Sequence, residues 1–275
     1  MEPFHVVVLL FLGLGAGVLG GLLGIGGSVI MIPVLVFVLG WPFHLAQAAA
    51  MTVNPAVALT AAIRHLRNNN LSVSTVKKVL PLSILCIAIA AWLSNQMKAP
   101  WLEAGFGLFL IWVLWDQIGA LMPSSKETET DPQGNSTRTT LTRTSLTGGL
   151  TGTVAGLLGI GGGLIQVPLL NRFCKLSMRN AIGSSSAIMF FTAIIGAVVK
   201  DISLSEILIE SKSNLQVKHA LIGALLLIPG ALVGGWLGAK ISGAISVKAI
   251  RVVFALLVSW AAFKMFYSSA SVLLF

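Results

Sequence analysis

The segment GLLGIGGSVIMIPVL, residues 21–35, occurs a second time in this chain as GLLGIGGGLIQVPLL, residues 156–170. Ten of the fifteen positions are identical at an offset of 135 residues, and most of the others exchange one apolar side chain for another. The same offset aligns two series of glycines spaced four residues apart, which are Gly13, Gly17, Gly21 and Gly148, Gly152, Gly156. A hydrophobic segment that is duplicated and interrupted by glycine in both copies is typical of a transporter's binding site.

The composition indicates a membrane protein. Of the 275 residues, 56% are hydrophobic and 10% are charged, against about 25% charged residues in ordinary soluble domains. Apolar runs long enough to cross a bilayer recur along the whole length, so we expect an all-α polytopic membrane protein. The net charge of +9 then indicates lysine and arginine in cytoplasmic loops rather than nucleic-acid binding. The first four residues carry no basic side chain, so they do not resemble a cleaved signal peptide.

The predicted segments form two homologous halves of four. We expect a first membrane repeat at residues 1–121, a flexible polar linker at 122–144 and a second membrane repeat at 145–275. In each half, three apolar segments follow the glycine-interrupted one, and we expect them at residues 44–63, 79–93 and 101–121 and at residues 180–199, 220–239 and 247–266. Polar loops are expected at residues 64–78 and 200–218.

Two topologies fit this plan. If each glycine segment is a broken helix that crosses the membrane, the halves are parallel, and the loops on the two sides carry 11 and 7 Lys and Arg residues. If each glycine segment is re-entrant, the halves are inverted, and the two counts become 13 and 5. Because cytoplasmic loops are enriched in Lys and Arg, the second distribution favours inverted repeats. Segment length is compatible with both topologies.

The glycine breaks are the predicted binding site for an anion. Glycines at this density interrupt a helix, expose backbone N–H groups and place the positive end of the following helix near mid-membrane. Two such ends at the interface between the halves bind an anion without a buried lysine or arginine. The alternative is that these glycines only allow helices to pack or bend. The predicted substrate-binding residues in the breaks are Gly26, Gly27, Ser28, Gly161, Gly162, Gly163 and Gln166.

Uncharged polar residues in the following spans complete the predicted site, namely Thr52, Asn54, Ser184, Ser185 and Ser186. A single hydroxyl often bonds only to its own helix. Because three serines are consecutive, we expect at least one of them to face a polar cavity. The acidic residues Glu103 and Asp116 lie near the ends of their span, so the sequence shows no mid-span carboxylate that would carry a proton.

The chain offers little for a metal, a cofactor or a disulfide. Its four histidines lie near segment ends without ligand spacing, and Cys86 and Cys174 form no recognisable framework. The segment GAGVLG at residues 15–20 imitates a dinucleotide-binding fingerprint, but no acidic residue follows at the required distance. We therefore expect neither a cofactor nor a metal site.

The duplicated motif Gly-Ile-Gly-Gly-(Ser/Gly)-x-Ile-x-x-Pro, at residues 24–33 and 159–168, resembles the TauE/SafE sulfite exporter family of membrane permeases. The resemblance covers nearly the whole chain. It implies transport of sulfur-containing or organic anions, such as sulfite, sulfoacetate or other sulfonates, across the cytoplasmic membrane. The small-residue patch that follows the motif matches the family better at residues 181–186 than at residues 46–52.

These patterns lead to the hypothesis of a multi-pass secondary transporter in the cytoplasmic (inner) membrane. Its expected partners are a small anionic substrate and the lipid bilayer, with no nucleic acid and no catalytic residue. A passive anion channel is the first alternative. An intramembrane enzyme is the second alternative. It would need a base beside a nucleophile, and the sequence places no histidine mid-span near Ser28 or the three serines. The sequence does not define the oligomeric state.

Overall fold

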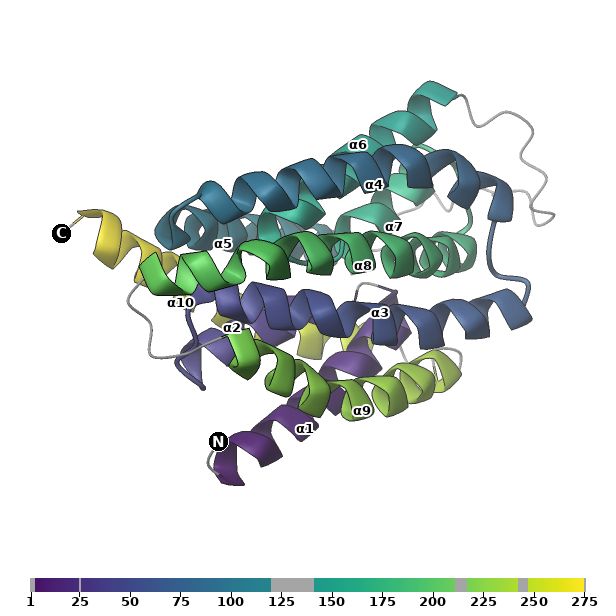
Figure 1. Ribbon diagram of the computed structural model, residues 1–275. Coiled ribbons are helices and arrows are strands. Elements are labelled where there is room, and N and C mark those ends of the chain that lie inside the picture. The colour runs from purple at the N-terminus through teal and green to yellow at the C-terminus, as the bar shows by residue number, and fades with distance from the viewer. Residues whose placement is uncertain (1–2, 25, 120–140, 211–216, 242–246, 275) are drawn as a thin grey trace.

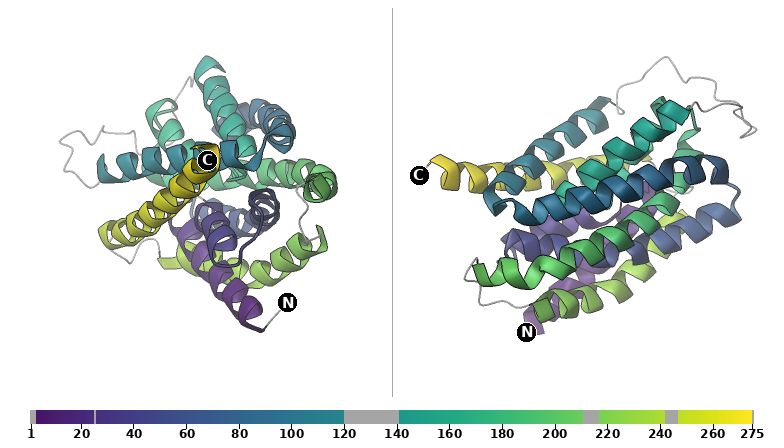
Figure 2. Two further views of the ribbon diagram at one scale, coloured as in Figure 1. Left: turned by 90° about the vertical axis from the view of Figure 1, so that its left-hand side faces the viewer. Right: turned by 45° about the horizontal axis from the view of Figure 1, so that its top comes forward.

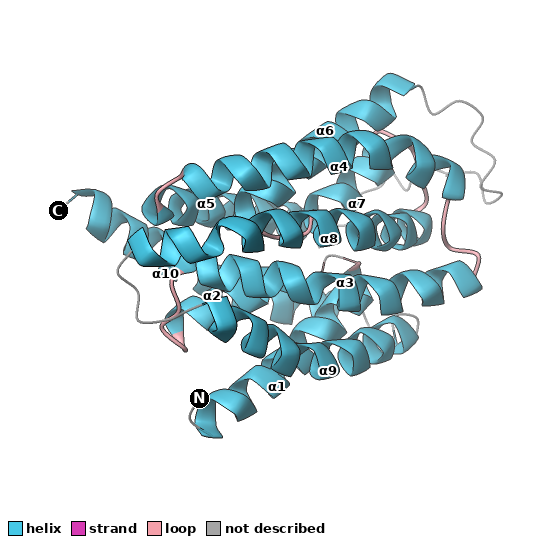
Figure 3. Ribbon diagram, viewed as in Figure 1, coloured by secondary structure: helices cyan, strands magenta, loops and turns pink. Residues whose placement is uncertain are grey.

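The fold is entirely helical in the part of the chain that the structure describes. This computed structural model describes residues 3–24, 26–119, 141–210, 217–241 and 247–274, and no strand occurs among them (Figure 3). Five of the described helices are long and apolar enough to cross a membrane, at Phe4–Leu23, Phe43–Arg67, Val73–Gln96, Met178–Ile209 and Val217–Ile241. The predicted all-α polytopic membrane protein is thereby confirmed.

Each half begins with a long helix and a short one, followed by three longer helices (Figure 1). The first half contains α1 (Pro3–Leu23), α2 (Ser28–Phe37), α3 (Phe43–Arg67), α4 (Val73–Gln96) and α5 (Ala99–Gly119). The second half contains α6 (Leu141–Leu158), α7 (Gly163–Arg172), α8 (Met178–Glu210), α9 (Val217–Ile241) and α10 (Val247–Leu274).

Both copies of the glycine motif fall where one helix ends and the next begins. α1 ends at Leu23 and α2 begins at Ser28. α6 ends at Leu158 and α7 begins at Gly163, each 135 positions later. Gly24 and Gly26 have φ angles of 67° and 75°, and Gly159 and Gly161 have φ angles of 72° and 69°. Only glycine adopts this left-handed conformation freely, so a turn of this shape requires glycine at these positions.

The first glycine segment enters and leaves at the same end of the bundle, as its contacts with α9 show. Gly13 of α1 lies against Leu227 of α9, and Gly21 lies further along, against Gly235 and Ala239. After the break the chain returns along α2, and Trp41 lies against Gly223 near the start of α9. The second segment behaves similarly: α6 runs along α4 from Val79 to Ile87, and Leu176 beyond α7 clusters with Val76 and Val79 near the start of α4.

Helices α3 and α8 lie side by side in opposite directions. Gln47 near the start of α3 bonds to Lys200 toward the end of α8, whereas His65 near the end of α3 lies against Gly183 near the start of α8. The start of α1 and the end of α10 also lie toward one end of the bundle (Figures 1 and 2). Because α3 and α8 follow the two copies of the motif, their antiparallel course is what inverted halves require. Inverted repeats and their sidedness stay a prediction.

The two glycine series allow the broken helices to approach their neighbours closely. A Cβ on Gly13, Gly17 or Gly21 of α1 would lie 2.3–2.5 Å from a backbone oxygen of α9, and a Cβ on Gly148, Gly152 or Gly156 of α6 would lie 2.5–2.6 Å from one of α4. Gly230, Gly234 and Gly238 of α9 are also spaced four residues apart, and all three face the backbone of α1. Each half therefore packs its broken helix against a long helix of the other half.

The predicted boundaries of two loops are wrong. α3 continues to Arg67 and α4 begins at Val73, where the Ser72 hydroxyl accepts a hydrogen bond from the Thr75 amide at 3.4 Å. α8 continues to Glu210, because Leu204 and Leu208 are buried at helical spacing beyond the charged pair that suggested a loop. The predicted linker at residues 122–144 lies mostly outside the described residues, and its last four residues form the first turn of α6.

The topology is testable with single cysteines at Asn68, Lys98 and Met178, all exposed, in a background that lacks Cys86 and Cys174. Inverted halves place Asn68 and Met178 on one side of the membrane, which the distribution of Lys and Arg predicts to be cytoplasmic, and Lys98 on the other. An impermeant maleimide applied from outside should therefore label only the Lys98 position in intact cells. Labelling of Met178 together with Lys98 would contradict re-entrant glycine segments.

The packing role of the α1 glycines predicts opposite effects at two neighbouring positions. Gly17→Ala brings a Cβ to within 2.5 Å of the Ala231 carbonyl oxygen, whereas Gly15→Ala meets nothing within 4 Å. Overpacking of this kind destabilises by about 1–3 kcal/mol, so Gly17→Ala should lower the melting temperature in detergent by several degrees. Gly15→Ala should leave it unchanged or raise it slightly. Equal melting temperatures for the two variants would rule out close packing of α1 on α9.

Candidate functional site

The two glycine breaks meet at the centre of the bundle. Gly26 in the first break and Gly161 in the second both lie against the same two side chains, Asn54 of α3 and Met189 of α8. Asn54 and Met189 are themselves 135 positions apart, so the two copies of the motif converge on one equivalent pair. The short helices α2 and α7 therefore start close to each other, as the sequence predicts.

Neither short helix has a side-chain cap at its start. The N-cap residues are Gly27 for α2 and Gly162 for α7, and no side-chain hydrogen bond closes either end. The first N–H groups of a helix lack intrahelical acceptors and carry a partial positive charge. Both ends are thus able to bind an anion.

Asn54 and Ser28 add polar side chains between the breaks. Both are fully buried, and the Asn54 amide nitrogen donates a hydrogen bond to the Ser28 hydroxyl. The amide oxygen of Asn54 has no partner among the described residues. The Ser28 hydroxyl can accept from the Asn54 nitrogen or donate to the Asn54 oxygen, because a hydroxyl does both. In either orientation of the amide, its other polar atom is able to contact a ligand.

Among the three serines of α8, Ser185 reaches both breaks. Its hydroxyl lies 3.3 Å from the Gly24 carbonyl oxygen, 3.5 Å from that of Gly163 and 3.3 Å from the Gln166 side-chain oxygen. The side-chain nitrogen of Gln166 is buried and has no partner among the described residues. The structure therefore brings two of the predicted binding residues, Ser185 and Gln166, to the glycine breaks.

Three of the predicted site residues lie elsewhere. The Ser184 hydroxyl accepts from the Ser72 amide at 3.0 Å, and the Ser186 hydroxyl donates to the carbonyl of Ile182 in its own helix at 3.0 Å. Thr52 donates to the Ala48 carbonyl oxygen at 2.9 Å and contacts Asp201 at 3.3 Å. The structure does not bring Ser184, Ser186 or Thr52 into contact with the breaks.

A buried lysine that the sequence reading placed in a loop lies beside the second break. Lys200 of α8 is 1% exposed, and its ammonium group donates to the Gln47 side-chain oxygen at 2.8 Å and to the Ser94 hydroxyl at 2.5 Å. Gln47 and Ser94 in turn donate to the Leu157 carbonyl oxygen at 3.2 and 2.9 Å. This carbonyl lies in the last turn of α6, where no following helical amide is available to bond it.

The structure also places a carboxylate in a helix, at a position where the sequence predicts a loop. Asp201 lies inside the candidate span Met178–Ile209, where one of its oxygens accepts from Thr52 and the other has no partner among the described residues. Its position escaped prediction because the adjacent charges of Lys200 and Asp201 look like the start of a loop. The apolar spacing of Leu204 and Leu208 was the signal for a continuing helix.

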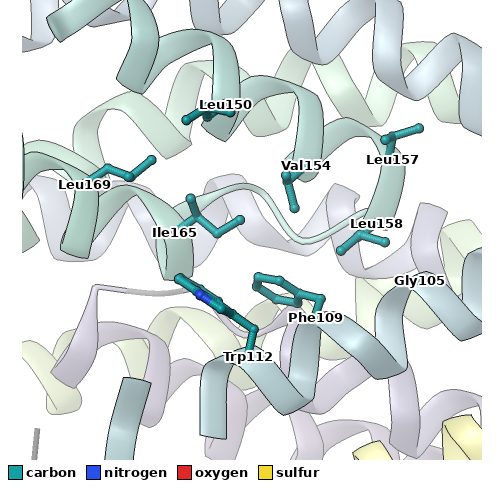
Figure 4. Close-up of a pocket in the computed structure, with 9 residues that line it drawn as sticks. All are labelled: Gly105, Phe109, Trp112, Leu150, Val154, Leu157, Leu158, Ile165 and Leu169. Carbon is teal, nitrogen blue, oxygen red and sulfur yellow. The ribbon is translucent and has the colours of Figure 1, made fainter. Parts of the chain in front are cut away.

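An apolar pocket lies behind the second break, between α5, α6 and α7 (Figure 4). Its volume is about 480 Å³, and it is lined by Gly105, Phe109, Trp112, Leu150, Val154, Leu157, Leu158, Ile165 and Leu169. The Trp112 indole nitrogen is the single polar side-chain atom in this lining. Because an anion needs several donors or a positive charge, this pocket does not suit one.

A family model described as "Sulfite exporter TauE/SafE" matches residues 9–265. A probable membrane transporter protein named YunE, from Bacillus subtilis, is 27% identical to this chain over 89% of it and 91% of its own length. A probable membrane transporter protein named MJ0441, from Methanocaldococcus jannaschii, is 25% identical over 89% of both chains.

A longer relative is the probable membrane transporter protein MamO from Magnetospirillum gryphiswaldense, which is 27% identical over 92% of this chain. The chain spans 44% of the length of that protein. No solved structure shows significant similarity to the chain.

Proposed function

The chain belongs to the TauE/SafE sulfite exporter family, and we propose that it is a secondary transporter whose anionic substrate binds between the starts of α2 and α7. The relatives are named as membrane transporters, and the apolar helices make this chain a multi-pass membrane protein. The family name and the chemistry of the site support a small sulfur-containing or organic anion, such as sulfite, sulfoacetate or another sulfonate. We place the transporter in the cytoplasmic membrane and assign it no catalytic residue.

The observation that carries this proposal is the convergence of two uncapped helix starts on Asn54 and Met189. Each helix end stabilises a nearby anion by about 0.3–2 kcal/mol, depending on burial. Each hydrogen bond from an N–H group to a charged ligand adds about 1.5–3 kcal/mol. Two such ends bind a single anion without placing a full positive charge at the centre of the membrane.

Side chains around the breaks supply further donors. The Ser185 hydroxyl, which reaches carbonyl oxygens on both breaks, turns toward the anion when it is bound. The Gln166 side-chain nitrogen has hydrogens to donate. The Asn54 side-chain nitrogen can also donate to the anion when the amide is turned so that its oxygen accepts from the Ser28 hydroxyl. These three side chains would recognise the oxygen atoms of a sulfite or sulfonate head.

The arrangement of the halves supports alternating access as the transport mechanism. The α1–α2 segment enters from one end of the bundle and the α6–α7 segment from the other, so each glycine break is reached from a different end. Movement of one broken helix along its partner in the other half would open the central site to one side at a time. Glycines at both interfaces bring the helix backbones into direct contact, which would allow such sliding.

Two adjacent serines provide a matched test of this site. Ser185→Ala removes the hydroxyl that reaches both breaks, whereas Ser186→Ala removes one that bonds to its own helix. Loss of one hydrogen bond to a charged ligand, about 1.5 kcal/mol or more, predicts at least tenfold weaker binding for Ser185→Ala. Ser186→Ala should bind normally.

The measurement is equilibrium binding of sulfite and sulfoacetate to purified protein, with radiolabelled uptake into proteoliposomes as the functional readout. Melting temperatures of both variants establish that they are folded. Normal anion binding by folded Ser185→Ala would place the site away from the breaks.

A further inference from the structure

Lys200 is a buried cation that the central anion site does not use. Its side chain is 1% exposed, and it lies within a candidate membrane span. Among the described residues, the single salt bridge joins Arg172 to Asp116, so the Lys200 ammonium has no carboxylate partner there. Burying an ammonium group with only neutral partners is unfavourable, and a charged residue inside a membrane span generally serves function.

The neutral groups around Lys200 are held in a fixed arrangement. Gln47 and Ser94 each use a donor on the Leu157 carbonyl oxygen, which leaves the Gln47 oxygen and a lone pair of the Ser94 hydroxyl directed at the ammonium group. These contacts account for two of the three ammonium hydrogens, and the third has no partner among the described residues. The network therefore positions a positive charge without neutralising it.

Lys200 lies next to the second break. The side chain of Gln47, its hydrogen-bond partner, packs against Gly159, where a Cβ would lie 2.9 Å from the Gln47 Cβ and Cγ. The Lys200 cluster also lies toward the end of the bundle where α3 begins, because its member Gln47 lies near the start of α3. At this end, His44 of α3 bonds to the carbonyl oxygen of Met97, the residue that follows α4. Lys200 thus stands between the central breaks and one end of the bundle.

The equivalent position in the first half also carries a buried basic residue. His65 lies 135 positions before Lys200 and occupies the opposite end of the α3–α8 pair. It is buried, and neither of its ring nitrogens has a partner among the described residues. A basic residue at the same repeat position near each end is expected if an anion passes along this pair of helices.

We propose that Lys200, held by Gln47 and Ser94, is a second anion-binding group that contacts the sulfite or sulfonate head of the substrate as it moves between the glycine breaks and the end of the bundle where α3 begins. This inference rests on the proposed function, the transport of a small anion, and not on which residues bind the anion at the centre. The bound anion supplies the negatively charged partner that the Lys200 ammonium group lacks in the protein alone. Lys200 therefore contributes affinity that the helix starts do not provide.

The test compares Lys200→Met with Lys98→Met in the full-length protein. Lys200→Met removes the buried charge at nearly constant side-chain length, and Lys98→Met removes an exposed lysine at the same end of the bundle. We expect Lys200→Met to weaken sulfite binding and slow sulfite uptake into proteoliposomes at least tenfold. Its melting temperature should be equal to or higher than that of the unmodified protein, because the desolvation cost of the buried charge is removed. Lys98→Met should change neither property.

Lys200→Gln is the second neutral variant, and it keeps a donor for Gln47 and Ser94 if the methionine variant is not recovered in folded form. It should show the same loss of binding. Sulfite binding and uptake within twofold of the unmodified protein in either folded variant would show that Lys200 has a structural role only, and would overturn the proposal.

Ser185→Ala in the same assay separates this proposal from the proposed central site. Loss of binding in Ser185→Ala with normal binding in Lys200→Met supports the central site and overturns the role of Lys200. The reverse pattern supports Lys200 and overturns the central site. Absence of sulfite and sulfoacetate binding by the unmodified protein would contradict both assignments.

Discussion

Backbone groups that a helix break exposes inside a membrane need hydrogen-bond partners, and this constraint explains the polar residues of the bundle. The broken helices α1 and α6 end in carbonyl groups that receive side-chain donors: Ser185 reaches Gly24, while Gln47 and Ser94 bond to Leu157. The starts of α2 and α7 receive no side-chain cap. The protein thus supplies side-chain donors to carbonyl groups at both breaks and no side-chain acceptor to the starts of α2 and α7, which is the polarity that the proposed anion site requires.

The same glycines that interrupt the helices also bring the two halves together. α1 packs on α9 and α6 packs on α4 through backbone contacts, so each glycine segment is held by the opposite half. This exchange places both breaks against Asn54 and Met189. A larger residue in either glycine series would separate the halves and also displace one wall of the proposed site.

The sequence predicts the duplicated breaks, the helical class and the packing glycines because each has a local signature: a repeated motif, an apolar run or a four-residue spacing. It does not separate Ser185 from Ser184 and Ser186, because that distinction depends on how α8 is rotated against its neighbours. It also misplaces Lys200, since adjacent charges usually mark a helix end. The halves differ in chemistry as well, because Ala50 stands where the second half has Ser185.

The central claim is that a small oxyanion binds where α2 and α7 start. Anomalous diffraction from crystals soaked in selenite, a heavier analogue of sulfite, tests it most directly because selenium reports its own position. The account predicts an anomalous peak between the two glycine breaks, within hydrogen-bonding distance of the Ser185 hydroxyl and the Asn54 amide. Well-diffracting soaked crystals with selenium peaks elsewhere, and none between the breaks, would contradict it.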